Sequence, residues 1–127
     1  MRGLALSIAV AFVAVFGAPD AAPADDASRF FSVIEDLPLM SGLSEDEAQG
    51  MAFDSPQGRI VEAYATGTVG PTEVLGFYRA ALPQLGWRET GPGTFARERE
   101  ILKLEFPADL QKGTRATVRF SLAPAAD

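Results

Sequence analysis

The chain has 127 residues and a net charge of −6, with no cysteine and no histidine. These two missing residue types exclude a Ser-His-Asp triad, a cysteine nucleophile, a thiolate or imidazole zinc site, a haem-binding histidine and any disulfide. We therefore expect one domain held together by packing alone, with no enzymatic activity, no cofactor and no metal site.

The first 24 residues have the pattern of a secretory signal peptide. Arg2 supplies a positive charge, residues 4–18 form an apolar run, and Ala22 and Ala24 have the small-x-small spacing that signal peptidase needs. We predict cleavage after Ala24, with cleavage after Ala18 or Ala22 as alternatives. An uncleaved anchor is the other alternative, but the apolar run is shorter than the roughly 20 residues that a spanning helix needs.

Residue usage also indicates where the exported chain works. Alanine is abundant and most basic residues are arginine, which is typical of a GC-rich bacterial genome, so we expect a periplasmic protein. A lipid-modified N-terminal cysteine is excluded because the chain has none. We therefore expect no stable membrane anchor after cleavage.

The charge of the mature chain is uneven along its length. Residues 25–55 hold eight acids and one base, whereas residues 56–127 hold nine bases and eight acids. This balance predicts no binding to nucleic acid or anionic lipid. We expect an acidic and partly apolar N-terminal arm at 25–50, a domain at 51–123 and a frayed end at 124–127. Solvation, a tether for a basic partner and a loose cation site are the alternatives for the acids.

The arm is too apolar for a disordered tail. Its candidate partner-binding residues are Phe30, Phe31, Leu37, Leu39 and Met40. Two interpretations of these side chains stay open. The segment from 30 to 40 lies across the domain and buries some of them, or it binds a partner in the cell envelope.

A short helical turn is predicted after the arm's apolar part. Ser41 and Gly42 have the composition of a chain turn. Ser44 and Glu47 then have the spacing of a capping box, and Gly50 would end the turn that this box begins.

The clearest element predicted from the sequence is a helix that begins at Pro71. Proline suits the first helical position, and Glu73 places a negative charge in the first turn. An apolar stripe follows with the 3.6-residue period, made of Val74, Phe77, Tyr78, Ala81, Leu82 and Leu85. Pro83 disfavours a helical residue before it, so we expect the helix to end or kink there and Gly86 to turn the chain. Trp87 is then placed to cap the core.

Alternating apolar and polar residues predict strands on both sides of this helix. The main strand before the helix is Arg59–Thr66, with a short strand at Met51–Asp54 ahead of it. Three strands follow the helix: Trp87–Thr90, which breaks at Gly91–Gly93 and resumes as Thr94–Arg99, then Ile101–Phe106 and Ala116–Leu122. Turn residues separate them, including Lys112 and Gly113 before the last strand. One amphipathic helix on an antiparallel sheet is an α+β fold, a two-layer sandwich with the order β-α-β-β-β.

The segment Glu73–Trp87 carries a motif. It resembles the pattern eV-x-x-FY-x-x-x-L-x-x-x-GW of a loose group of small exported bacterial domains. In that group the motif follows an apolar P-x-x-P-G-like segment, where this chain has Leu37–Leu43 with Ser41 in place of a proline. The resemblance covers Leu37 to Leu122. It implies the fold and an exported location, and it implies no activity.

Carboxylates are the reactive groups that the sequence retains. Glu35 with Asp36 and the run 45–47 resemble the acids of a glycosidase, but adjacent acids on a strand or helix point apart. The ligand spacing of a calcium-binding EF-hand is missing, and so is a glycine-rich phosphate loop.

Two classes of function follow from these exclusions. The first is a non-enzymatic protein-interaction module of the cell envelope, with the apolar arm as its interface. The alternative is a carrier of a small apolar ligand between helix and sheet, in a cavity lined by Phe77, Leu82, Phe106 and Phe120. An enzyme and a stand-alone structural protein are the remaining interpretations, and the oligomeric state stays open.

Overall fold

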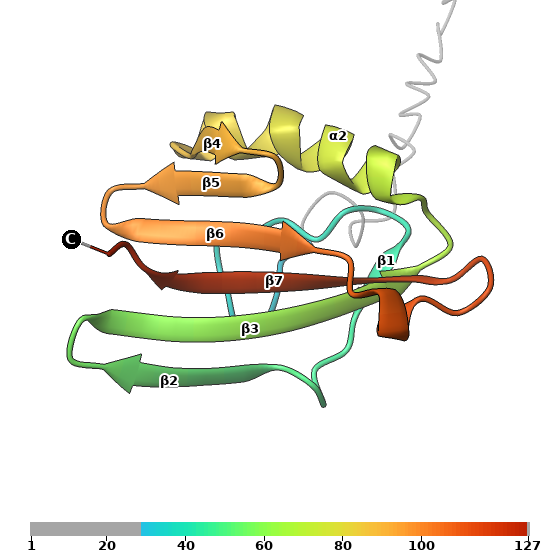
Figure 1. Ribbon diagram of the computed structural model, residues 1–127, viewed down its shortest axis with the longest axis horizontal. Helices are drawn as coiled ribbons and strands as arrows, with labels where there is room; N and C mark the ends of the chain where they lie inside the picture. Colours follow the sequence, from blue (N-terminus) through green and yellow to red (C-terminus); the bar gives the residue numbers. More distant parts are fainter. Residues whose placement is uncertain (1–28, 127) are drawn as a thin grey trace, which may run out of the picture.

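The computed structural model describes residues 29–126, so the predicted signal peptide and its cleavage site lie outside the described part. One α-helix and seven strands form this part, with two short 3-10 helices (Figure 1). The strands are β1 (Leu43–Glu45), β2 (Met51–Ser55), β3 (Gly58–Gly67), β4 (Arg88–Gly91), β5 (Thr94–Arg97), β6 (Glu100–Glu105) and β7 (Ala116–Pro124). The helices are α2 (Pro71–Ala81), η1 (Leu82–Leu85) and η2 (Ala108–Leu110).

The strands make a single antiparallel sheet in the order β1-β3-β7-β6-β5-β4. β2 pairs with the same edge of β3 as β1 does, so β2 and β4 lie at opposite edges of the sheet (Figure 1). The α+β prediction is confirmed. β7 continues through Pro124, and the Ala125 amide donates to the Arg99 carbonyl at 2.7 Å, so the chain is paired beyond the predicted strand end at Leu122.

Helix α2 begins and ends where the sequence predicts. Pro71 occupies its first turn, and the chain tightens at Leu82 into η1, which ends at Gly86 with a left-handed φ of 92°. Leu85 was expected in the apolar stripe but is 39% exposed. Leu85 is the last residue of η1, and it lies past the end of α2 at Ala81.

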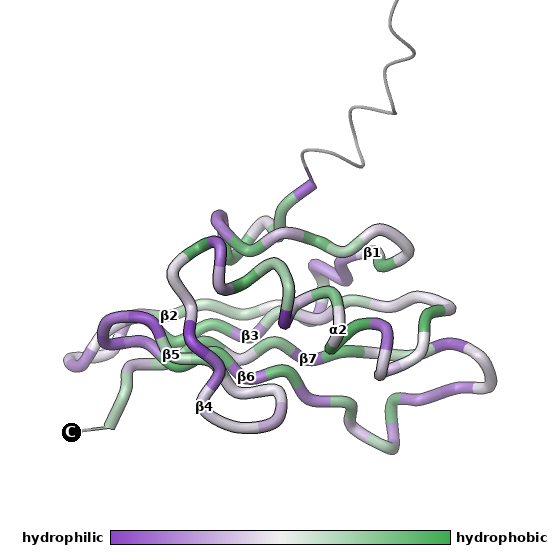
Figure 2. Tube along the Cα trace, turned by 90° about the horizontal axis from the view of Figure 1, so that it is seen from above, coloured by the Kyte–Doolittle hydropathy of each residue, from purple (hydrophilic) through white to green (hydrophobic). Residues whose placement is uncertain are grey.

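One face of the sheet carries the core. Alternate side chains of its strands are buried there, namely Val61, Ala63 and Ala65 of β3, Phe95 of β5, Leu102 and Leu104 of β6, and Val118, Phe120 and Leu122 of β7. Both α2 and the arm cover this face, as Figure 2 shows from the side. The Phe120 ring lies 4.7 Å from Phe31 of the arm and 5.1 Å from Tyr78 of α2, measured between centroids. The second layer is therefore half helix and half arm.

The arm keeps its shape through its own backbone hydrogen bonds. The Phe31 amide donates to the Leu37 carbonyl, and the Leu39 amide donates to the Arg29 carbonyl, each at 3.0 Å. This closed loop turns Ile34 into the core together with Phe31, Leu37 and Leu39. The predicted boundary at residue 50 therefore does not separate an arm from a domain, because both sides of it share one core.

The predicted capping box at Ser44–Glu47 does not form, although a turn that ends at Gly50 follows it, in which the Gly50 amide donates to the Glu47 carbonyl at 3.2 Å. Residues 43–45 instead form strand β1, which pairs with the last three residues of β3. The Glu45 carboxylate accepts hydrogen bonds from the amide and the hydroxyl of Ser32, at 2.8 and 2.9 Å, rather than capping a helix. A free strand edge offers backbone partners to three residues at once, and this outweighs the local preference for a capping box.

The hydroxyl of Tyr78 joins the arm to the helix. It donates to the Pro38 carbonyl at 2.7 Å and accepts from the Met40 amide at 3.2 Å. Burial raises the pKa of this phenol well above its ordinary value, and the hydrogen bond from Met40 opposes this shift weakly. The neutral hydroxyl therefore holds two part-buried backbone groups of the arm.

The Tyr78→Phe variant should lose about 1–3 kcal/mol of unfolding free energy, because both backbone groups lose their partner. Urea denaturation at neutral pH measures the loss. Because the pKa of Tyr78 is higher in the folded chain than in the unfolded chain, where it is near 10, the phenol contributes its full stability below about pH 10. This contribution is lost as the pH rises further, because the unfolded chain then ionises first. The difference between wild type and variant should therefore shrink above about pH 10, and a difference that grows there would contradict this account.

Candidate functional site

The structure separates the five residues predicted to bind a partner into two groups. Phe31, Leu37 and Leu39 are buried in the core, so in the folded chain these side chains offer little surface to a partner. Phe30 remains 49% exposed, and Met40 is partly buried against the core. The expectation that the arm lies across the domain is confirmed, and it removes most of the apolar surface that the arm was expected to offer.

The space between helix and sheet is filled by side chains. Leu82 and Phe120 are fully buried, and Phe77 packs edge-on against Tyr78 at 4.9 Å between ring centroids. Four surface hollows of the described residues are lined by other side chains than Phe77, Leu82, Phe106 and Phe120. The described part of the chain therefore gives the small-ligand alternative no support.

The largest uncovered surface is the second face of the sheet. The arm and α2 cover only the face that bears Phe120, and side chains alternate between the two faces along each strand. The cross-strand register places Met51 and Phe53 of β2 on the open face beside Glu62 and Ile60 of β3. Met51 and Phe53 are 46% and 47% exposed, which makes them two of the four large apolar residues that are exposed in residues 29–126.

Two carboxylates of the open face are bound by neighbouring side chains of the same face. Arg119 of β7 bonds Glu105 of β6 at 2.8 Å, and the Tyr64 hydroxyl donates to Glu62 at 3.4 Å. The hydrogen bond to Glu105, followed by that to Tyr64, raises the pKa of Arg119 further above its ordinary value, so this residue stays charged. The face is thus a mixed apolar and charged surface.

A shallow hollow of about 440 Å³ lies on this face over β6 and β7. Its lining includes the side chains of Ile101, Lys103, Glu105, Ser121 and Ala123. These residues mix two apolar positions with one base and one acid. They offer contacts to a polypeptide surface, and they do not converge on a reacting atom.

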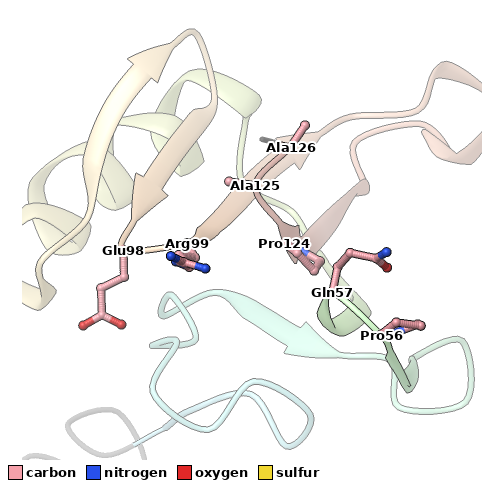
Figure 3. Close-up of a pocket in the computed structure, with 7 residues that line it drawn as sticks. All are labelled: Pro56, Gln57, Glu98, Arg99, Pro124, Ala125 and Ala126. Atoms are coloured by element: carbon pink, nitrogen blue, oxygen red, sulfur yellow. The ribbon is translucent and has the colours of Figure 1, made fainter.

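A second hollow, of about 470 Å³, lies where the β2–β3 and β5–β6 turns meet the end of β7 (Figure 3). Gln57, Arg99 and Pro124 line it, and Figure 3 shows the Glu98 side chain pointing away from Gln57 and Pro124. Glu98 has a φ of 53°, which places this turn residue in the left-handed region. No acidic side chain that lines this hollow is in contact with a basic one, so the hollow offers no acid–base pair for catalysis.

The predicted carboxylate clusters do not form a site. Asp36 pairs with Arg97 at 2.7 Å, and Glu45 is held by Ser32. Across residues 29–126, no group of three or more acidic side chains is arranged to hold a metal ion. No helix in the same range is long and apolar enough to cross a membrane.

The open face is the feature that sequence reasoning missed. Its signal was present, since Met51 and Phe53 alternate with Ala52 and Asp54 in a strand placed next to β3. The alternation does not say which face the helix and the arm cover. A comparison of the chain with protein-family models, curated proteins and solved structures finds no match.

Proposed function

We propose that the chain is an exported protein-interaction module of the periplasmic cell envelope, and that it binds its partner without catalysing a reaction. The single observation that supports this most is the uncovered sheet face, with Met51 and Phe53 almost half exposed at its edge. Large apolar side chains gathered on an uncovered face are typical of interaction surfaces. Export rests on the sequence pattern of residues 1–24.

The chemistry of the surface agrees with binding rather than catalysis. Histidine and cysteine are missing from the whole sequence, and Glu105 of the open face is held in an ion pair by Arg119. The interface moves from the arm, where the sequence analysis placed it, to the open face, because the arm's apolar side chains are used in the core.

Site-specific photo-cross-linking in the periplasm tests this proposal. A cross-linking residue at Ile60 or Ala123 on the open face should trap one identified envelope protein, and one at Gln84 on η1 should not. The recovered chain should begin at Asp25, as its intact mass would show. Retention in the cytoplasm, or equal adducts from Ile60 and Gln84, would count against the proposal.

A further inference from the structure

Within residues 29–126, strand β2 leaves one backbone edge unpaired. The last pair of the β2–β3 hairpin is Ser55 with Gly58, and the two-residue turn Pro56-Gln57 joins them. In such a hairpin, Ser55 and Gly58 exchange backbone hydrogen bonds. Hydrogen-bonded and non-bonded pairs alternate from there along an antiparallel ladder. The backbone N–H and C=O groups of Ala52 and Asp54 therefore point away from β3, toward the free edge.

Side chains next to this edge are exposed on both faces of the sheet. Met51 and Phe53 extend the open face, and Ala52 and Asp54 extend the other face beyond the arm, where both are exposed. In a strand added at this edge, every second side chain would lie beside Met51 and Phe53, and the side chains between them would lie beside Ala52 and Asp54. One set would lie against apolar surface and the other against the Asp54 carboxylate.

The part of the sheet around β2 is acidic. The span from β1 through β3, residues 43–67, holds five acids and Arg59 as its single base, a net charge of −4. The span from β4 through β7, residues 88–124, holds seven bases and five acids, a net charge of +2. An incoming segment with basic side chains is therefore attracted to the β2 edge and not to the opposite one.

The other edge strands are protected in ways that β2 is not. β4 has four residues, its register shifts between Glu89 and Gly91, and Glu89 is bound to Arg79 of α2 at 2.8 Å. β1 has only three residues. Bulges, charges and short length are devices that keep edge strands from pairing with other chains. β2 pairs with β3 in regular register over five residues, and Asp54 is its single charged residue.

We propose that β2 receives an extended partner segment with alternating apolar and basic residues, which adds to the sheet as a further strand. This inference rests on the proposed function and specifies how the partner binds. Backbone hydrogen bonds to Ala52 and Asp54 would provide the pairing, as in other cases of strand addition. Contact with Met51 and Phe53, and charge attraction to Asp54, would select the sequence.

The test uses the chain from Asp25 onward and a short synthetic peptide in which valine and lysine alternate. Fluorescence anisotropy should show binding that weakens with salt. The same peptide with glutamate in place of lysine, or with a central proline, should bind much more weakly. On binding, the amides of Ala52 and Asp54 should gain protection from hydrogen exchange, because they point to the free edge.

Variants of β2 locate the contact. Phe53→Ser should weaken binding of the peptide roughly tenfold, because Phe53 is 47% exposed beside the added strand. Leu85→Ser, which removes a leucine that is 39% exposed elsewhere on the surface, should not weaken it. Ala52→Pro removes an outward donor that the native ladder does not use, so it should abolish binding while the chain still unfolds cooperatively. If the Ala52→Pro variant does not fold, Asp54→Lys is used in its place. The Asp54→Lys variant should bind the glutamate peptide more tightly than the lysine peptide.

The outcomes separate this inference from the proposed function. If the Ala52→Pro variant still gives the open-face cross-links and still binds the peptide as the wild type does, the strand-addition inference is wrong. The proposed interaction module then stands. Equal binding of the lysine and glutamate peptides, no binding of either, or a dimer that depends on β2 would each overturn the inference. Loss of all specific cross-links would instead overturn the proposed function on which it rests.

Discussion

Deletion of residues 25–42 is expected to unfold the whole domain. The deleted segment includes four buried side chains, Phe31, Ile34, Leu37 and Leu39. Each contributes about 1.5–3 kcal/mol by burial, or about 6–12 kcal/mol together, which is as large as the entire stability of a typical domain. Circular dichroism and urea denaturation should show loss of the cooperative transition.

Two point variants show whether packing, and not chain length, causes this effect. Phe31→Ala should cost about 3–5 kcal/mol, since the ring fills the space beside Phe120. Its neighbour Phe30 is half exposed, so Phe30→Ser should change the unfolding free energy by less than about 0.5 kcal/mol. A deleted chain that still unfolds cooperatively near the wild-type midpoint would show that the arm is an attachment and would restore it as a candidate interface.

Periodicity was sufficient to predict the main elements from the sequence. The stripe that begins at Val74 fixed helix α2, and alternation in Ile101–Phe106 and Ala116–Leu122 fixed β6 and β7. These signals are local, because each reports that one side of an element is buried. They also identify most of the sheet side of the core.

The role of the arm could not be predicted in the same way. The apolar residues of the arm follow neither the 3.6-residue period of a helix nor the two-residue period of a strand. The contacts that bury the arm are long-range, such as Phe31 with Phe120 and Pro38 with Tyr78. The same limit applies to β1, where pairing with β3 replaces a local capping pattern. The candidate site was missed for this reason, since locating the open face requires knowing that the arm covers the other one.

Strand β1 lies so close to the end of β3 that Gly67 admits no side chain. A Cβ built on Gly67 would lie 2.0 Å from the carbonyl oxygen of Gly42, which is backbone and cannot rotate aside. The φ of Gly67 is outside the left-handed region, so an alanine there meets a steric obstacle and no dihedral strain. The close approach follows from the register, which pairs Gly67 with Leu43 on one side and Ala116 on the other.

The Gly67→Ala variant should therefore lose about 3 kcal/mol or more of unfolding free energy, at the upper end of the cost of overpacking. Gly76→Ala is the matched control with the opposite sign, because Gly76 is exposed on α2 and a Cβ there meets nothing within 4 Å. It should stabilise the chain by about 0.5–1 kcal/mol through its helix propensity. Urea denaturation of both variants measures the two changes. If Gly67→Ala were as stable as wild type, with the Leu43 amide still protected from exchange, β1 would not approach β3 as closely as this structure has it.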